Sequence, residues 1–222
     1  PDYPADNEYR LDNDIDASDT INWNNGAGFI PIYEFRGKFY GDGHKISNLY
    51  INNTNPSYYT GLFSRIRYGT STGGFVQQLI IENADITGTT EVGILAGEIL
   101  NDGGGGIYPA LQNIAVSGTV QGVQMVGGIV GVSTGDISII DCYSRANLMT
   151  IPSSDPYMDF GGICGRMVKG YLATSSYIGE IYINVHPTIK GENSGIKSPP
   201  GAYIGGLVGA AMMAPTISNC HA

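Results

Sequence analysis

The sequence predicts an all-β repeat fold, a β-solenoid in which short strands of successive repeats stack on one another. One observation is a hexad of the type Val126-Gly-Gly-Ile-Val-Gly131, which occurs in five copies that begin at residues 59, 92, 126, 160 and 204. The copies are therefore separated by steps of 33, 34, 34 and 44 residues. A second observation is that no window has the 3.6-residue apolar period of an amphipathic helix. Regular self-similarity is typical of repeat folds, whose short strands bury a core only when neighbouring repeats stack.

The glycines of the hexads are predicted to be structural. Glycine permits either a positive φ at a corner or the close approach of a neighbouring strand, and both suit a solenoid corner. This assignment covers Gly61, Gly93, Gly97, Gly127, Gly128, Gly131, Gly161, Gly162, Gly165, Gly205, Gly206 and Gly209. The first and fourth hexad positions are apolar and are expected to form stacked columns: Tyr59, Val92, Val126, Phe160 and Ile204, then Leu62, Leu95, Ile129, Ile163 and Leu207. A β-propeller is the rival fold, but its blades need about 40 to 50 residues each.

We predict a single domain over residues 1–222, with a lead-in cap at 1–34 and stacked repeats at 35–222. The lead-in is rich in Asp and Asn and ends near the turn dipeptide Asn25-Gly26, so it is suited to cover the unpaired end of a stack. Between the hexads, runs at 75–82, 111–120, 137–143 and 177–185 are each expected to form one strand. Loops at 103–106, 148–159 and 186–202 interrupt the pattern and are candidate binding loops.

A further run extends from Phe35 to Ile51, where Gly41-Asp42-Gly43 separates an aromatic strand from a second strand. Together with residues 9–18 and the hexads, this run resembles the GLUG-motif family of bacterial surface and secreted proteins, over nearly the whole chain. Ser64 and Ile94 depart from the glycine that the family pattern favours. The resemblance implies a right-handed parallel β-helix of about five GLUG-type repeats, an adhesin-like extracellular role and no catalytic residues.

Charge and hydropathy exclude several classes of partner. The net charge is −9 and the isoelectric point is about 4.6, which argues against nucleic acid, because phosphate backbones need clustered Lys and Arg. No run of 18 apolar residues is present, so no transmembrane segment is expected. The chain begins at Pro1 with no basic and apolar leader. The resemblance implies an extracellular or bacterial cell-surface location, so we expect that a signal sequence has been removed.

The three cysteines, Cys142, Cys164 and Cys220, fit neither a disulfide framework nor a CxxC metal site, because they are odd in number and widely spaced. Cys164 occupies the fifth hexad position and is predicted to be a buried, inert thiol. Cys142 and Cys220 each follow an Ile-containing run, so they are expected to share a column of their own with one repeat between them.

One acidic cluster suggests a metal. Asp12, Asp14, Asp16 and Asp19 place four carboxylates within eight residues, and Ca²⁺ takes six to eight oxygen ligands. The glycine and distal glutamate of an EF-hand are absent, and capping of turns explains the cluster more simply. We therefore predict no cofactor, with Ca²⁺ as the one ion that the cluster suggests.

Histidines offer little chemistry. His44 follows Asp42 and Gly43, an arrangement that suggests a general base, but no nucleophile is nearby and a structural role is favoured. His186 and His221 are distant in sequence, so no metal triad is proposed.

An enzyme is the second function class considered. Some parallel β-helices carry paired carboxylates on successive turns and cleave glycans. The acidic candidates are Asp136, Asp141, Asp155, Asp159 and Glu180, and no spacing selects two of them. The prediction is that the chain is not an enzyme.

Tyrosine is abundant, with 15 residues, and six of them crowd the N-terminal third: Tyr33, Tyr40, Tyr50, Tyr58, Tyr59 and Tyr68. An apolar ring with a polar tip suits sugars and protein partners. We predict a surface adhesin or adhesin stalk that passively binds a host glycan or protein. The alternatives are a polysaccharide lyase or hydrolase and a purely structural spacer. Residues 216–222 read as the start of a further turn, so a longer natural chain or an exposed edge is expected, with a monomer or a weak edge-paired oligomer.

Overall fold

The strands form four sheets in the computed structural model, which describes residues 7–55, 59–68, 73–103, 108–153, 158–179, 181–182, 202–213 and 215–222. We call the four sheets A to D. Every pairing between the named strands is parallel. The prediction of an all-β fold is confirmed, and its sheets are parallel.

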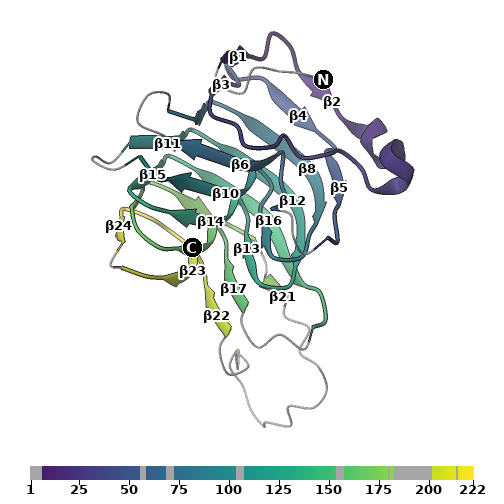
Figure 1. Ribbon diagram of the computed structural model, residues 1–222. Helices are drawn as coiled ribbons and strands as arrows, with labels where there is room; N and C mark the ends of the chain where they lie inside the picture. Colours follow the sequence, from purple (N-terminus) through teal and green to yellow (C-terminus); the bar gives the residue numbers. More distant parts are fainter. Residues whose placement is uncertain are drawn as a thin grey trace.

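The strands of each sheet follow one another in chain order (Figure 1). Sheet A contains β1 (Glu8–Arg10), β3 (Lys38–Tyr40), β7 (Phe75–Gln77), β11 (Tyr108–Gln112), β15 (Ile137–Ile140), β19 (Tyr171–Ala173) and β24 (Thr216–Ser218). Sheet B contains β2 (Ile15–Asp16), β4 (Lys45–Ser47), β8 (Ile80–Thr87), β12 (Ala115–Gly122), β16 (Tyr143–Thr150) and β20 (Ser176–Tyr177), with β5 (Tyr50–Asn52) beside β8 and β21 (Ile181–Tyr182) beside β16. Sheet C contains β6 (Phe63–Tyr68), β10 (Ala96–Asn101), β14 (Val130–Thr134), β18 (Cys164–Met167) and β23 (Val208–Ala211). Sheet D contains β9 (Glu91–Val92), β13 (Met125–Gly127), β17 (Met158–Gly161) and β22 (Ala202–Gly205).

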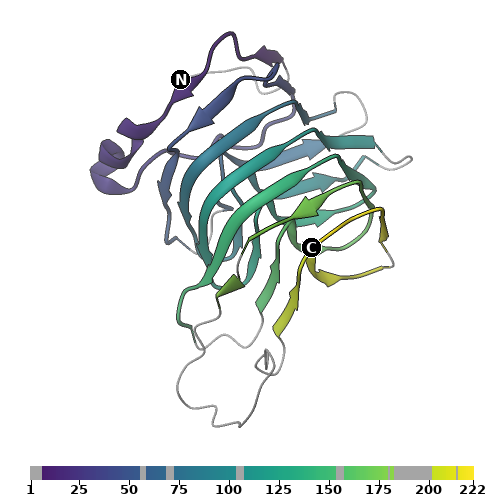
Figure 2. The ribbon, with the colours of Figure 1, turned by 180° about the vertical axis from the view of Figure 1, so that it is seen from behind.

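The chain visits sheets A, B, D and C in that order and then returns to A, so each turn lies beside the next. Figure 2 shows this as bands of strands whose colours pass from purple to yellow along the stack. In sheet D, Val126 faces Val92 and Phe160, and Phe160 also faces Ile204. The predicted steps of 34, 34 and 44 residues are therefore confirmed residue by residue.

One prediction was wrong at the corner between sheets A and B. The runs at 75–82, 111–120 and 137–143 were each expected to be one strand, but each is divided between two sheets. The break lies at Gln78, Asn113 and Asp141, which have φ values of 54°, 55° and 53°. A left-handed residue ends an extended strand, and Asn and Asp adopt this conformation more readily than most residues. Each complete turn consequently supplies at least four strands.

At the hexad corners, the glycines allow two strands of one turn to approach closely. None of the hexad glycines has a positive φ. A Cβ added to Gly127 would lie 1.9 Å from the Val130 carbonyl oxygen, and one added to Gly161 would lie 2.2 Å from the Cys164 carbonyl oxygen. Of the two roles considered for these glycines, the structure selects close backbone approach.

The core is built from the predicted columns in the middle turns. Val126, Phe160, Ile129 and Ile163 are completely buried, so both the first and the fourth hexad positions face the interior. In the last turn, by contrast, Leu207 is only partly buried.

The cysteines behave as predicted. All three are free, and burial raises the pKa of Cys164 to about 12. Cys142 and Cys220 occupy one column with Ser175 between them, since Ser175 Oγ accepts from the Cys142 N–H and the Ser175 carbonyl accepts from the His221 N–H.

The N-terminal residues both extend and cover the stack. Strands β1 and β2, which fall inside the predicted cap, pair with β3 and β4 as a first turn. After β2, the irregular 3₁₀ segment η1 (Ser18–Gly26) packs against β5 at the edge of sheet B. Within the residues that the structure describes, no helix has the length and apolar character to cross a membrane.

Candidate binding site: a tyrosine groove

The candidate site begins where the chain crosses from sheet B to sheet C after η1. Gly28 pairs antiparallel with Ile51, and its φ of 83° and the nearby Tyr50 carbonyl leave no room for a Cβ. The Phe29 N–H donates to the Tyr50 carbonyl at 2.9 Å. The chain then joins sheet C, where Ile32 pairs with Phe63 in parallel. Residues 30 and 31 therefore bridge two sheet edges and leave a hollow beneath them.

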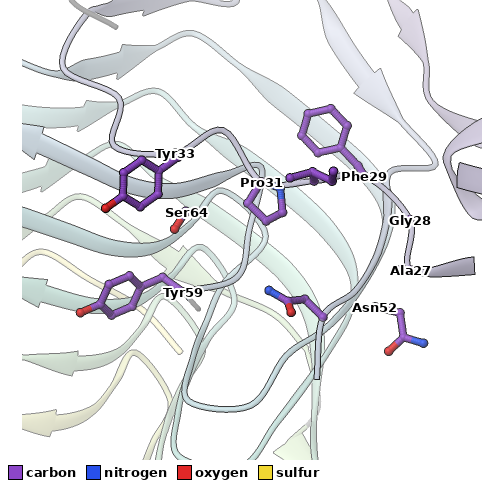
Figure 3. A pocket seen from close by; sticks show the side chains of 10 residues that line it. Ala27, Gly28, Phe29, Pro31, Tyr33, Asn52, Tyr59 and Ser64 are labelled. Atoms are coloured by element: carbon purple, nitrogen blue, oxygen red, sulfur yellow. The ribbon is translucent and has the colours of Figure 1, made fainter. Parts of the chain in front are cut away.

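This hollow is a groove of about 350 Å³, which we call the tyrosine groove (Figure 3). It is lined by Ala27, Gly28, Phe29, Ile30, Pro31, Tyr33, Asn52, Asn53, Tyr59 and Ser64. No charged side chain is among them, and Tyr33 is 64% exposed. Figure 3 shows the Tyr33 and Tyr59 rings pointing the same way, with the Ser64 hydroxyl between them. Aromatic, amide and hydroxyl groups thus converge on one open concave surface.

Tyr59 reaches the groove because the first hexad copy is one residue out of register. Phe63 faces Ala96, as the 33-residue step predicts, but Thr60 rather than Tyr59 faces Val92. The prediction that Tyr59 belongs to the first apolar column was therefore wrong, and Thr60 occupies that place. Tyr59 lies one residue earlier, outside the column, and is only partly buried.

A charged pair holds the Tyr59 ring. The Arg65 guanidinium carbon lies 4.5 Å from the ring centroid, and Arg65 Nε donates to Glu98 Oε2 at 2.5 Å. Burial and the Glu98 charge together raise the pKa of Tyr59, although Arg65 acts in the opposite direction. The phenol is therefore neutral and able to donate a hydrogen bond at ordinary pH.

Further charged side chains lie at the corner of sheets C and D in the second and fourth hexad copies, and the copy between them has Met125 and Val132 at these places. These charged side chains immediately precede or follow a hexad, as Glu91 and Glu98 flank the second copy, and Asp159 and Arg166 flank the fourth. Burial raises the pKa of Glu91, and the Glu98 charge adds to this effect. Asp159 is 1% exposed; burial raises the pKa of its carboxyl, and Arg166 opposes that shift. Sequence reasoning missed Glu91, Glu98, Arg65 and Arg166, although a comparison of the residues flanking each hexad would have found them.

Two members of the acidic cluster at residues 12–19, Asp14 and Asp16, accept hydrogen bonds within the protein. Asp14 Oδ1 lies 3.1 Å from His44 Nδ1 and accepts from the Lys45 N–H at 3.2 Å. Asp16 Oδ1 accepts from the Ser18 N–H and from Asn48 Nδ2, both at 3.0 Å. These contacts lower the pKa of both carboxyls, led by the Lys45 N–H for Asp14 and by Asn48 for Asp16. The Ser18 contact matches the predicted turn role, whereas the contacts with His44, Lys45 and Asn48 join this segment to the next turn of the chain. Across the described ranges no three His, Cys, Asp or Glu side chains are arranged to hold a metal.

The histidines and the remaining acidic candidates that the structure describes do not form a site together. Asp42, the expected neighbour of His44, instead pairs with Arg10. Asp136 pairs with Lys169 at 2.7 Å, and Asp141 accepts from the Thr174 hydroxyl at the corner of sheets A and B. His221 is exposed near the C-terminus. Asp155, Glu180 and His186 lie outside the described residues, as does most of the predicted loop at 186–202.

Of the five N-terminal tyrosines that the structure describes, Tyr33 and Tyr59 line the groove. Tyr40 packs on sheet A, where the Arg10 guanidinium carbon lies 4.1 Å from its ring centroid. Tyr50 belongs to β5 and Tyr68 to β6, and Tyr58 lies outside the described residues. The sequence indicated that tyrosines were concentrated here, but it did not show which of them converge.

No protein-family model matches the chain. The chain is similar to halomucin from Haloquadratum walsbyi (strain DSM 16790 / HBSQ001), with 40% identity over 134 residues, which cover 56% of this chain and 1% of halomucin. Among solved structures, it is similar to a Bacteroides ovatus protein described as a "putative immunoglobulin A1 protease", with a TM-score of 0.63 and 23% identity. That likeness covers 96% of this chain and 60% of the Bacteroides protein, and it concerns the fold alone.

Proposed function

We propose that this chain is a binding segment of a secreted or surface-exposed protein, and that it binds a glycan or a protein through the tyrosine groove. The observation that carries the proposal is the convergence of Tyr33 and Tyr59 on an uncharged open groove of about 350 Å³. Concave sites with aromatic walls and a few polar groups are the usual places for ligands. The stacked sheets behind the groove provide the rigid support on which binding residues are commonly presented.

The proposal includes the finer fold and the family. The repeating order of four parallel sheets supports a right-handed parallel β-helix of about five GLUG-type repeats, as the sequence resemblance implies. Parallel strands in one sheet are nearly always joined by right-handed connections. A crystal structure would test the hand directly, since a left-handed path would contradict the proposal.

The extracellular location is supported by similarity to a protein that is named as a mucin, although only 1% of that protein is matched. The net charge of −9 is compatible with a soluble surface segment that does not bind nucleic acid.

The test is a screen of the purified chain on glycan arrays and immobilised host matrix proteins, with two tyrosine variants. Tyr33→Ala removes a ring that is 64% exposed at the groove, and Tyr203→Ala removes one that is 59% exposed in β22, outside the groove lining. We expect a ligand whose binding is weakened in Tyr33→Ala and unchanged in Tyr203→Ala. Absence of any ligand would favour a structural spacer and would contradict the proposal.

A glycan hydrolase is a second candidate, because burial raises the pKa of Glu91, with a smaller contribution from the Glu98 charge, and the two residues flank one hexad. A glutamate with a raised pKa beside a second carboxylate is the usual pair for general acid catalysis of glycoside cleavage. Release of reducing ends from polysaccharides, abolished in Glu91→Gln, would favour this candidate. Binding of the same polysaccharides without cleavage would favour the passive role.

A further inference from the structure

We propose that the ligand of the tyrosine groove is a neutral glycan, whose sugar rings stack on Tyr33 and Tyr59. This inference rests on the proposed binding function and narrows it to one class of ligand. The inference follows from the lack of charged side chains in the groove lining, from the hydrogen bonds that the surrounding backbone already makes, and from the kinds of side chain that line the groove.

The charge argument excludes acidic ligands. None of the ten lining side chains is charged. The cation beside the groove is Arg65, whose guanidinium already pairs with Glu98 at 2.5 Å and covers the Tyr59 ring. An acidic polysaccharide would have to approach a chain of net charge −9 without a cation in the groove to receive it. A neutral ligand meets no such penalty.

The backbone argument excludes an extended peptide that adds a strand. Such peptides bind through unpaired N–H and C=O groups at a sheet edge. Along the groove the Phe29 N–H already donates to Tyr50, and the Ile32 N–H donates to Leu62 at 2.9 Å. The Asn52 N–H likewise donates to the Ala27 carbonyl at 2.9 Å. These three backbone donors, which lie on both sides of the groove, are therefore engaged within the protein and cannot pair with an added strand.

The lining matches the two-sided chemistry of a sugar. A pyranose ring has an apolar C–H face that packs on an aromatic ring, and its edge carries hydroxyls that both donate and accept hydrogen bonds. Tyr33 and Tyr59 provide the rings, and the amides of Asn52 and Asn53 provide paired donors and acceptors. In Figure 3 the two tyrosines lie toward one end of the groove and Asn52 toward the other, so one short oligosaccharide would meet both kinds of group.

The chain contains its own reporter of binding. Trp23 is the single tryptophan, it is 48% exposed, and its ring centroid lies 6.3 Å from that of Phe29, which lines the groove. A ligand in the groove is therefore expected to change the tryptophan fluorescence.

The experiment is a fluorescence titration of the chain with neutral hexasaccharides of glucose, mannose and N-acetylglucosamine, and with a hexasaccharide of galacturonic acid. We expect saturable binding of at least one neutral sugar, with the same affinity in about 0.1 M and about 1 M NaCl, because no charged group lines the groove. Tyr33→Ala should weaken binding about tenfold, while Tyr33→Phe keeps the ring and should bind within about threefold of wild type. Tyr203→Ala is the matched control and should bind as wild type does.

Binding of the acidic sugar alone, or an affinity that falls steeply with salt, would overturn the inference. So would a protein ligand that depends on Tyr33 when no neutral sugar binds, although the proposed function would then stand. If neither sugars nor proteins bind, the proposed function fails as well. Circular dichroism of each variant shows whether it is folded, and Tyr33→Phe keeps the inference testable should Tyr33→Ala unfold.

Discussion

The middle turns and the N-terminal end of the stack both contain the hexad corner between sheets D and C. The two regions differ in whether the first hexad side chain faces the core or the surface. In the middle turns the hexad brings two strands so close that Gly127 has no room for a Cβ, and the apolar columns are completely buried. At the N-terminal end the hexad corner is one residue out of register, and Tyr59 is moved from the interior to a groove.

This difference shows how a repeat scaffold can form a groove by a shift in register, without an additional helix or strand. A shift of one residue in an extended chain moves a side chain to the opposite face, because the side-chain period of a strand is two. Thr60 takes the interior place and Tyr59 takes the outer one. The comparison predicts that substitutions in the two regions separate stability from binding.

The largest expected effect is on stability and comes from Gly127→Ala. The new Cβ would lie 1.9 Å from the Val130 carbonyl oxygen, so the corner backbone would have to move. We expect a loss of about 4 kcal/mol or more in the free energy of unfolding, measured by urea denaturation. Gly43→Ala is the control, because Gly43 has a φ of 84° with no atom within 4 Å of its added Cβ, and it should cost about 1 kcal/mol. Equal losses in the two variants would contradict the close-approach role.

The next largest effect is also on the free energy of unfolding, and it distinguishes the buried middle of an apolar column from its less buried C-terminal end. Ile129 is completely buried and Leu207, in the last turn, is only partly buried. Ile129→Ala should cost about 3 kcal/mol, because it leaves a cavity that neighbouring turns cannot fill. Leu207→Ala should cost clearly less in the same urea titration. A larger loss for Leu207→Ala would mean that another chain or turn covers the C-terminal end in solution.

The smallest effect is pH-dependent and concerns Glu91. Burial raises the pKa of this carboxyl, so its ionised form is disfavoured in the folded state. Its contribution to stability is therefore fully present below the ordinary carboxyl pKa of about 4 and is lost as the pH rises through the raised value. Glu91→Gln should consequently raise the urea midpoint at about pH 7 and leave it nearly unchanged at about pH 3. A variant that is destabilised at neutral pH would show that Glu91 makes a favourable contact as a carboxylate.

Much of the scaffold was predictable from the sequence, because its rules are periodic. The hexad spacing gave the register of Val126 with Phe160, and the fifth-position column correctly placed Cys164 in the core. The strand breaks at Gln78 and Asn113 were missed, because a residue with positive φ inside an apolar run leaves the apolar pattern intact. The candidate catalytic carboxylates Asp136 and Asp141 do not form a pair, because they lie at opposite ends of β15.

The groove itself was only partly predictable. The abundance of tyrosine in the N-terminal third was visible in the sequence. The convergence of Tyr33 with Tyr59 depends on two long-range features, the antiparallel pairing of Gly28 with Ile51 and the register shift at Thr60. Neither has a local pattern, because both arise where the repeat ends and its periodic constraint no longer applies.

The central claim is that the hexads hold the fold and the tyrosine groove binds the ligand. The most direct test is the dissociation constant of Tyr33→Ala, relative to wild type, for a ligand found in the array screen. We predict that binding weakens about tenfold while the free energy of unfolding stays within about 0.5 kcal/mol of wild type, as expected for an exposed ring. An unchanged dissociation constant would contradict the claim and would place the binding surface elsewhere on the stack.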